Sequence, residues 1–115
     1  MRKIKFRAYD KVLGMCKVFQ IDFEHHTLWV KRNNQFYELN WENSPPIEYI
    51  GRKDKNGKEI YEGDIVQGTK SKGTVEWWRA AWWINCEGDM YGLVDDAPWK
   101  VIGNIYENPE LLEKP

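Results

Sequence analysis

Few residues in this chain have the types and spacing that metal binding or catalysis requires. His25 and His26 are adjacent, so on a strand their side chains would point to opposite faces and would not readily bind one ion. A structural zinc site needs about four ligands, and Cys16 and Cys86 lie far apart without CxxC spacing. These residues therefore predict neither a metal centre nor a Cys–His nucleophile.

The carboxylates are no better placed for catalysis. Asp95 and Asp96, with Glu87 and Asp89, form an acidic group, but no histidine or nucleophile accompanies them in the sequence, so we interpret them as a solvated loop. Residues 54–57 begin like a calcium loop, yet the glycine stands fourth instead of sixth. We therefore expect a non-enzymatic protein with no catalytic residues, no bound metal and no cofactor.

The most unusual stretch contains two tryptophan doublets, in residues 77–83 (WWRAAWW). Residues 74–78 and 81–85 are predicted strands around a tip near Arg79 and Ala80. Because strand side chains alternate, one ring of each doublet should face inwards and the other outwards. Outward rings beside basic residues would form an aromatic and basic surface. The candidate binding residues are Trp78, Arg79, Trp82, Trp83, Lys70 and Lys72.

Three interpretations of this surface stay open. The rings can pack internally, they can anchor a protein partner, since Trp and Arg dominate binding hot spots, or they can stack single-stranded bases. The 17 basic and 18 acidic residues nearly cancel, which favours a protein partner over nucleic acid. An exposed aromatic doublet also favours burial in a second copy, so we predict a homo-oligomer.

Hydrophobic periodicity predicts a mainly β protein. Residues 3–9 alternate between apolar and polar types, and many further short segments rich in aromatic and β-branched residues lie between turn signals. No long window has the 3.6-residue period of a helix. Short strands with frequent turns indicate a small barrel or sandwich.

Two tight turns punctuate residues 49–66. Asn56-Gly57 predicts a type I′ turn with positive φ at both residues. Gly51, Gly57 and Gly63 suit positions of positive φ or close approach. The side chain of Asp64 can accept hydrogen bonds from backbone amides of its turn. These five residues are predicted to be structural.

Three segments of the chain resemble one family. Residues 1–10 (MRKIKFRAYD), 49–66 (YIGRKDKNGKEIYEGDIV) and 101–112 (VIGNIYENPELL) are similar to the opening, central and closing motifs of the YopX family of phage and prophage proteins. The resemblance implies a mostly β domain whose C-terminal part is an SH3-like barrel, and a phage or prophage origin. It implies no activity and carries over no catalytic residue.

We therefore predict a single YopX-like domain over residues 1–115, with an N-terminal hairpin subregion (1–44) packed on a barrel subregion (47–115). Asn43-Ser44-Pro45-Pro46 is the strongest break between them. No apolar run reaches the length of a membrane span, and the cysteines are expected to be reduced, so we expect a cytoplasmic protein. Its predicted partner is a protein: itself, a phage protein or a host protein.

Overall fold

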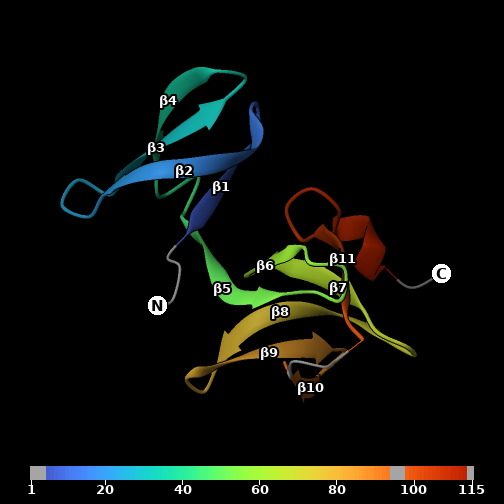
Figure 1. Cartoon of the computed structure of the whole chain (residues 1–115). Coiled ribbons are helices and arrows are strands. Elements are labelled where there is room, and N and C mark those ends of the chain that lie inside the picture. Colours follow the sequence, from blue (N-terminus) through green and yellow to red (C-terminus); the bar gives the residue numbers. More distant parts are fainter. Residues whose placement is uncertain (1–4, 94–97, 114–115) are drawn as a thin grey trace. The chain divides into compact units, whose positions relative to one another are not determined.

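The computed structural model describes residues 5–93 and 98–113, which consist mainly of strands (Figure 1). The chain forms two compact units, Met1–Tyr49 and Ile50–Pro115. No helix within the described ranges is long and apolar enough to cross a membrane. The elements are β1 Phe6–Asp10, β2 Gly14–Asp22, β3 Thr27–Arg32, β4 Gln35–Asn40, β5 Ile47–Lys53, β6 Glu59–Tyr61, β7 Asp64–Gln67, β8 Lys72–Trp78, β9 Ala81–Cys86, β10 Asp89–Gly92, β11 Lys100–Asn104 and the 3-10 helix η1 Pro109–Leu112.

The first unit is an antiparallel sheet in the order β4-β3-β2-β1-β5. β1 and β2 form the N-terminal hairpin that the alternation near residues 3–9 predicted. Ala8, Cys16, Leu28 and Val30 share one face of the sheet, and each is at most 2% exposed. Apolar residues at every second position therefore bury one face of the unit and leave the other face to polar and aromatic side chains.

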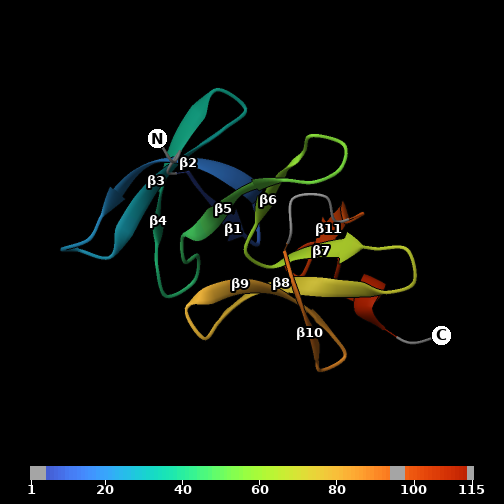
Figure 2. The same ribbon diagram turned by 60° about the horizontal axis from the view of Figure 1, so that its bottom comes forward.

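The second unit contains an antiparallel sheet in the order β10-β9-β8-β7-β11 (Figure 2). β5 continues into this unit, where β6 is its neighbour. The core is built from aliphatic side chains of these strands and the buried thiol of Cys86. Its buried members are Ile50, Ile60, Val66, Val75, Ile84, Cys86 and Val101.

Both sheets are antiparallel, as expected for a mainly β chain, but the predicted closed barrel was wrong. Closing a barrel requires the two edge strands of a sheet to pair with each other. In the described residues β10 pairs with β9 and β11 with β7, and no ladder joins β10 to β11. Counting short strands could not reveal this, because closure depends on pairing between segments that lie apart in sequence.

Gly73 in β8 packs closely against β9. A Cβ added there would lie 2.6 Å from the backbone oxygen of Asn85, 2.7 Å from Sγ of Cys86 and 2.8 Å from Cγ2 of Ile84. The first of these atoms belongs to the backbone and cannot rotate away. A side chain at this position would therefore push β9 away from the core.

We expect Gly73→Ala to lower the free energy of unfolding by about 2 kcal/mol, because overpacking of this kind displaces backbone. Gly92→Ala is the matched control, since a Cβ there would meet nothing within 4 Å. Urea denaturation of both variants measures the difference. Equal stability of the two variants would contradict the tight β8–β9 packing.

Candidate functional site

The two tryptophan doublets lie at the tip of the β8–β9 hairpin, as the sequence predicted. Trp77 pairs with Trp82, and Trp78 pairs with Ala81, so Arg79 and Ala80 form a two-residue loop. Their φ angles are 47° and 61°. Positive φ at both positions is the pattern of a type I′ turn, which normally requires Gly, Asn or Asp. Arg79 and Ala80 therefore hold a strained conformation at the most aromatic point of the chain.

The rings alternate between the two faces of the hairpin. Trp77 and Trp82 share the face of Val75 and Ile84, and their ring centroids are 5.0 Å apart in an edge-to-face arrangement. Of the first doublet, only Trp78 was predicted to be a binding residue, yet Trp77 is 55% exposed and Trp78 41% exposed. Trp82 packs against the core, whereas Trp77 opposite it is more than half exposed, so facing the core side of the sheet does not bury Trp77.

The opposite face of the hairpin is held by specific contacts. Trp78 and Trp83 form a second edge-to-face pair, with centroids 5.7 Å apart. The indole Nε1 of Trp83 donates a hydrogen bond to the backbone oxygen of Trp78 (2.8 Å). The guanidinium of Arg79 lies 4.5 Å from the centre of the Trp78 ring. Trp77, Trp78, Arg79, Trp82 and Trp83 together form what we call the aromatic tip.

Lys70 and Lys72 do not join the aromatic tip. Lys72 is the first residue of β8 and Trp78 the last of its seven residues, so the two ends lie about 20 Å apart. Lys70 belongs to the loop before β8 (Figure 1). The structure therefore separates the predicted aromatic and basic surface into an aromatic end that carries Arg79 and a distant end that carries the two lysines.

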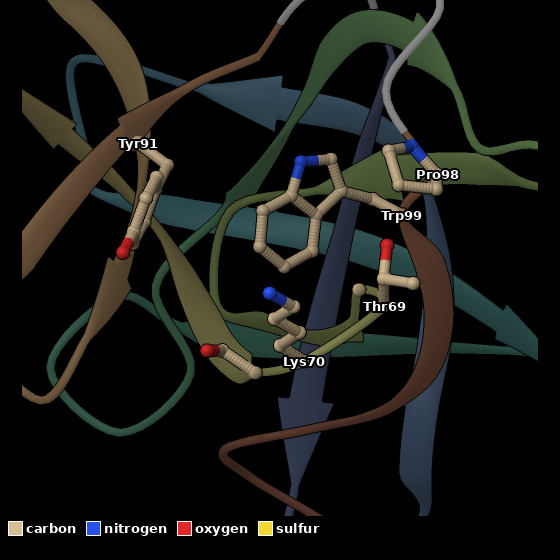
Figure 3. Close-up of a pocket in the computed structure, with 7 residues that line it drawn as sticks. Thr69, Lys70, Tyr91, Pro98 and Trp99 are labelled. Carbon is tan, nitrogen blue, oxygen red and sulfur yellow. The ribbon is translucent and has the colours of Figure 1, made fainter.

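Lys70 instead borders a cavity of about 400 Å³ in the second unit (Figure 3). Tyr91 and Trp99 face each other across it, with ring centroids 6.3 Å apart, and the side chain of Lys70 extends towards the Trp99 ring. Gly68 allows this arrangement, because a Cβ there would lie 2.8 Å from the Trp99 ring. The cavity is lined by Gly68, Thr69, Lys70, Ser71, Tyr91, Pro98 and Trp99.

Sequence reasoning did not select Tyr91 or Trp99, since neither belongs to a doublet or a motif. An isolated Trp after a proline, just before a predicted strand, was the only available signal. The cavity lining has hydroxyl groups and one ammonium group but no carboxylate, imidazole or thiol. Its composition supports contact with a ligand. In this lining the hydroxyl groups and the ammonium have no carboxylate, imidazole or thiol beside them to activate them.

The central turn is organised by the carboxylate of Asp54, which is buried at 9% exposure. Its Oδ1 accepts hydrogen bonds from the backbone amides of Asn56 (2.8 Å) and Lys58 (2.9 Å). Its Oδ2 accepts one from the amide of Val101 (2.9 Å), 47 residues away. Burial alone would raise the pKa of Asp54, but the amides of Val101, Lys58 and Asn56 together hold it below its usual value.

The predicted type I′ turn at Asn56-Gly57 was wrong in one respect. Gly57 has φ of 82°, as expected, but Asn56 is not among the described residues with positive φ. The amide of Gly57 donates to the oxygen of Asp54 (3.0 Å), and the amide of Asp54 donates to the oxygen of Lys58 (2.8 Å). This pattern fits a type I turn followed by a glycine bulge. The Asp54 side chain accepts a hydrogen bond from the Asn56 amide, two residues on, as in an Asx turn.

Gly51 and Gly63 also have positive φ, 86° and 82°, so both occupy conformations that favour glycine. A Cβ on Gly63 would lie 3.0 Å from the ring of Tyr106. Oδ2 of Asp64, which is buried at 1% exposure, accepts a hydrogen bond from the amide of Tyr61 (2.8 Å). The central motif thus has a complete structural explanation.

Comparison with known proteins identifies the fold. The family model described as YopX protein matches residues 5–113. The chain belongs to the YopX family. The resemblance of the three sequence motifs is thereby confirmed.

Two solved structures share this YopX fold. A crystal structure of protein EF1440 from Enterococcus faecalis has a TM-score of 0.64 and 22% identity, covering 98% of this chain and 100% of that one. The crystal structure of protein yopX from Bacillus subtilis has a TM-score of 0.62 with the same identity and coverage. At this identity the likeness concerns the fold alone. No curated protein sequence matches the chain.

The remaining candidates for chemistry have local partners. In this YopX chain Nδ1 of His25 lies 2.8 Å from Oδ2 of Asp22, and the His26 ring stacks on Trp41 at 5.0 Å. Cys16 and Cys86 are buried free thiols, and burial raises the pKa of both. Among residues 5–93 and 98–113, no three potential ligands come together for a metal ion. Asp95 and Asp96 lie outside the described residues.

We expect Ala80→Gly to raise the free energy of unfolding by about 1 kcal/mol, because glycine removes the left-handed strain of the tip. Asn34→Gly is the matched control: Asn34 has φ of 63° in the two-residue loop between β3 and β4, but asparagine tolerates this region. Thermal unfolding compares the two variants. An equal or larger gain in Asn34→Gly would contradict strain at Ala80.

We expect Asp54→Asn to lower the free energy of unfolding by about 2 kcal/mol, because an amide cannot accept all three backbone hydrogen bonds. The pKa of Asp54 is lowered in the folded protein. Its contribution to the free energy of unfolding is therefore fully present above the usual aspartate pKa of about 3.9 and is lost as the pH falls through the lower folded-state pKa.

Denaturation of both proteins between neutral and strongly acidic pH tests this. The stability difference should be constant near neutrality and shrink under acid. Asp10→Asn is the control. Asp10 accepts hydrogen bonds from the amides of Val12 and Leu13 in a local turn, so its replacement should lower the free energy of unfolding much less. A difference independent of pH would rule out the charged form as the stabilising species.

Proposed function

We propose that this YopX chain is a non-enzymatic protein-interaction module and that the aromatic tip is its contact surface. The supporting observation is the exposure of Trp77 and Trp78, 55% and 41%, in a hairpin whose tip keeps two non-glycine residues at positive φ. Strain of this kind persists where the surrounding structure enforces it, and it concentrates at functional sites. Large exposed rings beside an arginine are the side chains that dominate protein interfaces.

The contacts within the aromatic tip favour tight binding. Two edge-to-face ring pairs and the hydrogen bond from Trp83 to Trp78 limit the rotamers of the free protein. Association with a partner therefore loses less side-chain entropy. Arg79 keeps its guanidinium on the Trp78 ring, where it can contact a carboxylate or carbonyl of the partner without unstacking.

We infer that the partner is a second copy of the chain, or a phage or host protein, acting in the bacterial cytoplasm. The motif resemblance to phage and prophage proteins supports the origin, and the two buried free thiols fit a reducing compartment. The proposal includes an SH3-like chain path for the second unit, supported by its five short antiparallel strands. SH3-like domains are common protein-binding scaffolds.

Single-stranded nucleic acid is the second candidate partner for the aromatic tip. The stacking of Arg79 on Trp78 favours it, because bases can stack on such surfaces. The two lysines that would add phosphate contacts lie about 20 Å away along β8. We therefore rank a protein partner first for this surface.

We expect the wild-type chain to self-associate in sedimentation velocity experiments over micromolar to submillimolar concentrations. Trp77→Ala with Trp78→Ala should weaken association by more than about 30-fold, the effect of one strong hot spot. Phe23→Ala is the control, since Phe23 is 70% exposed in the other unit. Equal weakening in the control would contradict the assignment of the tip.

A photo-crosslinking amino acid at position 78, compared with one at position 23, tests for other partners in the bacterial host. A protein adduct from position 78 alone would support the proposal. A monomeric wild type that gives no adduct from either position would overturn it.

A further inference from the structure

The outer face of the first unit carries a second group of exposed rings, which the aromatic tip does not explain. On the sheet β4-β3-β2, Phe19 is 52% exposed, Trp29 36% and Phe36 55%. Lys17 and Lys31 are exposed on the same face, because Lys17 lies opposite Lys31 and Lys31 opposite Phe36. We call these five residues the aromatic-basic face.

Strand register brings the positive charges into one row across the sheet. Arg7 lies opposite Lys17, Lys17 opposite Lys31, and Lys31 opposite Phe36. Within residues 5–93 and 98–113, no side-chain ion pair engages Lys17 or Lys31. Like charges directly opposite each other on a sheet are destabilising. The opposed Lys17 and Lys31 therefore lower folding stability unless an anion neutralises them.

The Phe19 ring lies beside this row. Phe19 is two residues after Lys17 in β2, so alternation places both side chains on the same face. The register between β2 and β3 shifts between Val18 and Gln20, which makes Phe19 the extra residue of a bulge, and its ring lies 4.8 Å from the Phe36 ring. The ammonium of Lys31 lies 5.8 Å from the centre of Phe36. Aromatic and positive groups are thus within reach of one ligand.

Trp29 extends the surface along the strands. It is two residues before Lys31 in β3, so both side chains are on the outer face. Because Phe36 lies opposite Lys31, Trp29 and Phe36 are diagonal neighbours about 7–8 Å apart. Glu38, the acidic residue opposite Trp29, is in the next row and not between the lysines. The face therefore offers two separate ring platforms beside a pair of cations.

We propose that the aromatic-basic face binds single-stranded nucleic acid, with bases stacked on Trp29 and on the Phe19–Phe36 pair and phosphates contacting Lys17 and Lys31. Protein interfaces are depleted in lysine, whereas a row of opposed lysines complements a polyanion. Exposed rings on an open sheet accept any base by its flat face, so we expect little sequence preference. This site is independent of the proposed protein-binding tip.

Fluorescence anisotropy of a labelled oligothymidylate with the full chain tests this inference. Wild type should bind at low salt, with a preference for the single strand over a duplex of the same length. Lys17→Gln with Lys31→Gln should reduce the slope of log K against log salt by about 1.4, since each phosphate contact on a single strand contributes about 0.7. Trp29→Ala should weaken binding by at least about fivefold, the lower limit for one stacked base.

Three control variants distinguish this site from the aromatic tip and from a general effect of surface charge. Lys11→Gln removes an exposed charge in the turn between β1 and β2 and should leave the slope unchanged. Trp78→Ala should weaken oligonucleotide binding less than Trp29→Ala does, because the aromatic tip has no pair of lysines for phosphate contacts. Lys31→Glu should raise Tm, since it replaces a repulsive cross-strand pair by an attractive one. The same variant should abolish oligonucleotide binding. A lysine with a purely structural role would not combine a higher Tm with a loss of binding.

Several results would overturn the inference. The first is that the wild type does not bind the oligonucleotide at low salt. The second is that it binds single strand and duplex with equal affinity. The third is that the double lysine variant keeps the wild-type slope of log K against log salt. Loss of binding only in Trp78→Ala would instead assign nucleic acid to the tip. A folded Lys31→Glu protein that binds as well as wild type would exclude the lysine row from the site.

Discussion

The carboxylate of Asp54 connects the central and closing sequence motifs. It bonds two amides of its own turn and the amide of Val101, at the start of β11. The neighbouring amide of Lys55 donates to the oxygen of Trp99 (3.1 Å), which fixes the residue before that strand. Trp99 then packs against the core of the second unit. One buried, hydrogen-bonded acid thus positions a strand, a core ring and a wall of the cavity.

A second junction between the same motifs lies at Gly63. Its amide donates to the oxygen of Val75 (2.9 Å), and its own oxygen accepts from the amide of Ile105 (2.9 Å). Asn104 closes the turn that follows, since its Oδ1 accepts from the amides of Tyr106 and Glu107. The most family-like residues therefore serve backbone hydrogen bonding. The YopX motifs therefore determine turns and strand ends of this fold.

The surfaces available for binding are consequences of β geometry outside those motifs. The two-residue hairpin loop places the first tryptophan doublet at the end of β8, where both rings are exposed. Alternation along β2 places Phe19 on the face of Lys17, next to a bulge in the pairing with β3. Both surfaces combine rings with cations, but they differ in the cation: arginine stacked on a ring at the tip, and opposed lysines on the first unit.

Local patterns were sufficient to predict the mainly β class, the first hairpin, the Arg79-Ala80 loop and the family, because period-two alternation and turn residues act over a few positions. The open sheet, the separation of Lys70 from Trp78, and the exposure of Trp77 followed only from strand pairing and strand length. In the turn at Asn56, the carboxylate that accepts the Asn56 amide also accepts the amide of Val101, 47 residues further along the chain. Periodicity and turn chemistry are properties of neighbours in sequence, whereas register, exposure and shared hydrogen-bond acceptors depend on which distant strands meet.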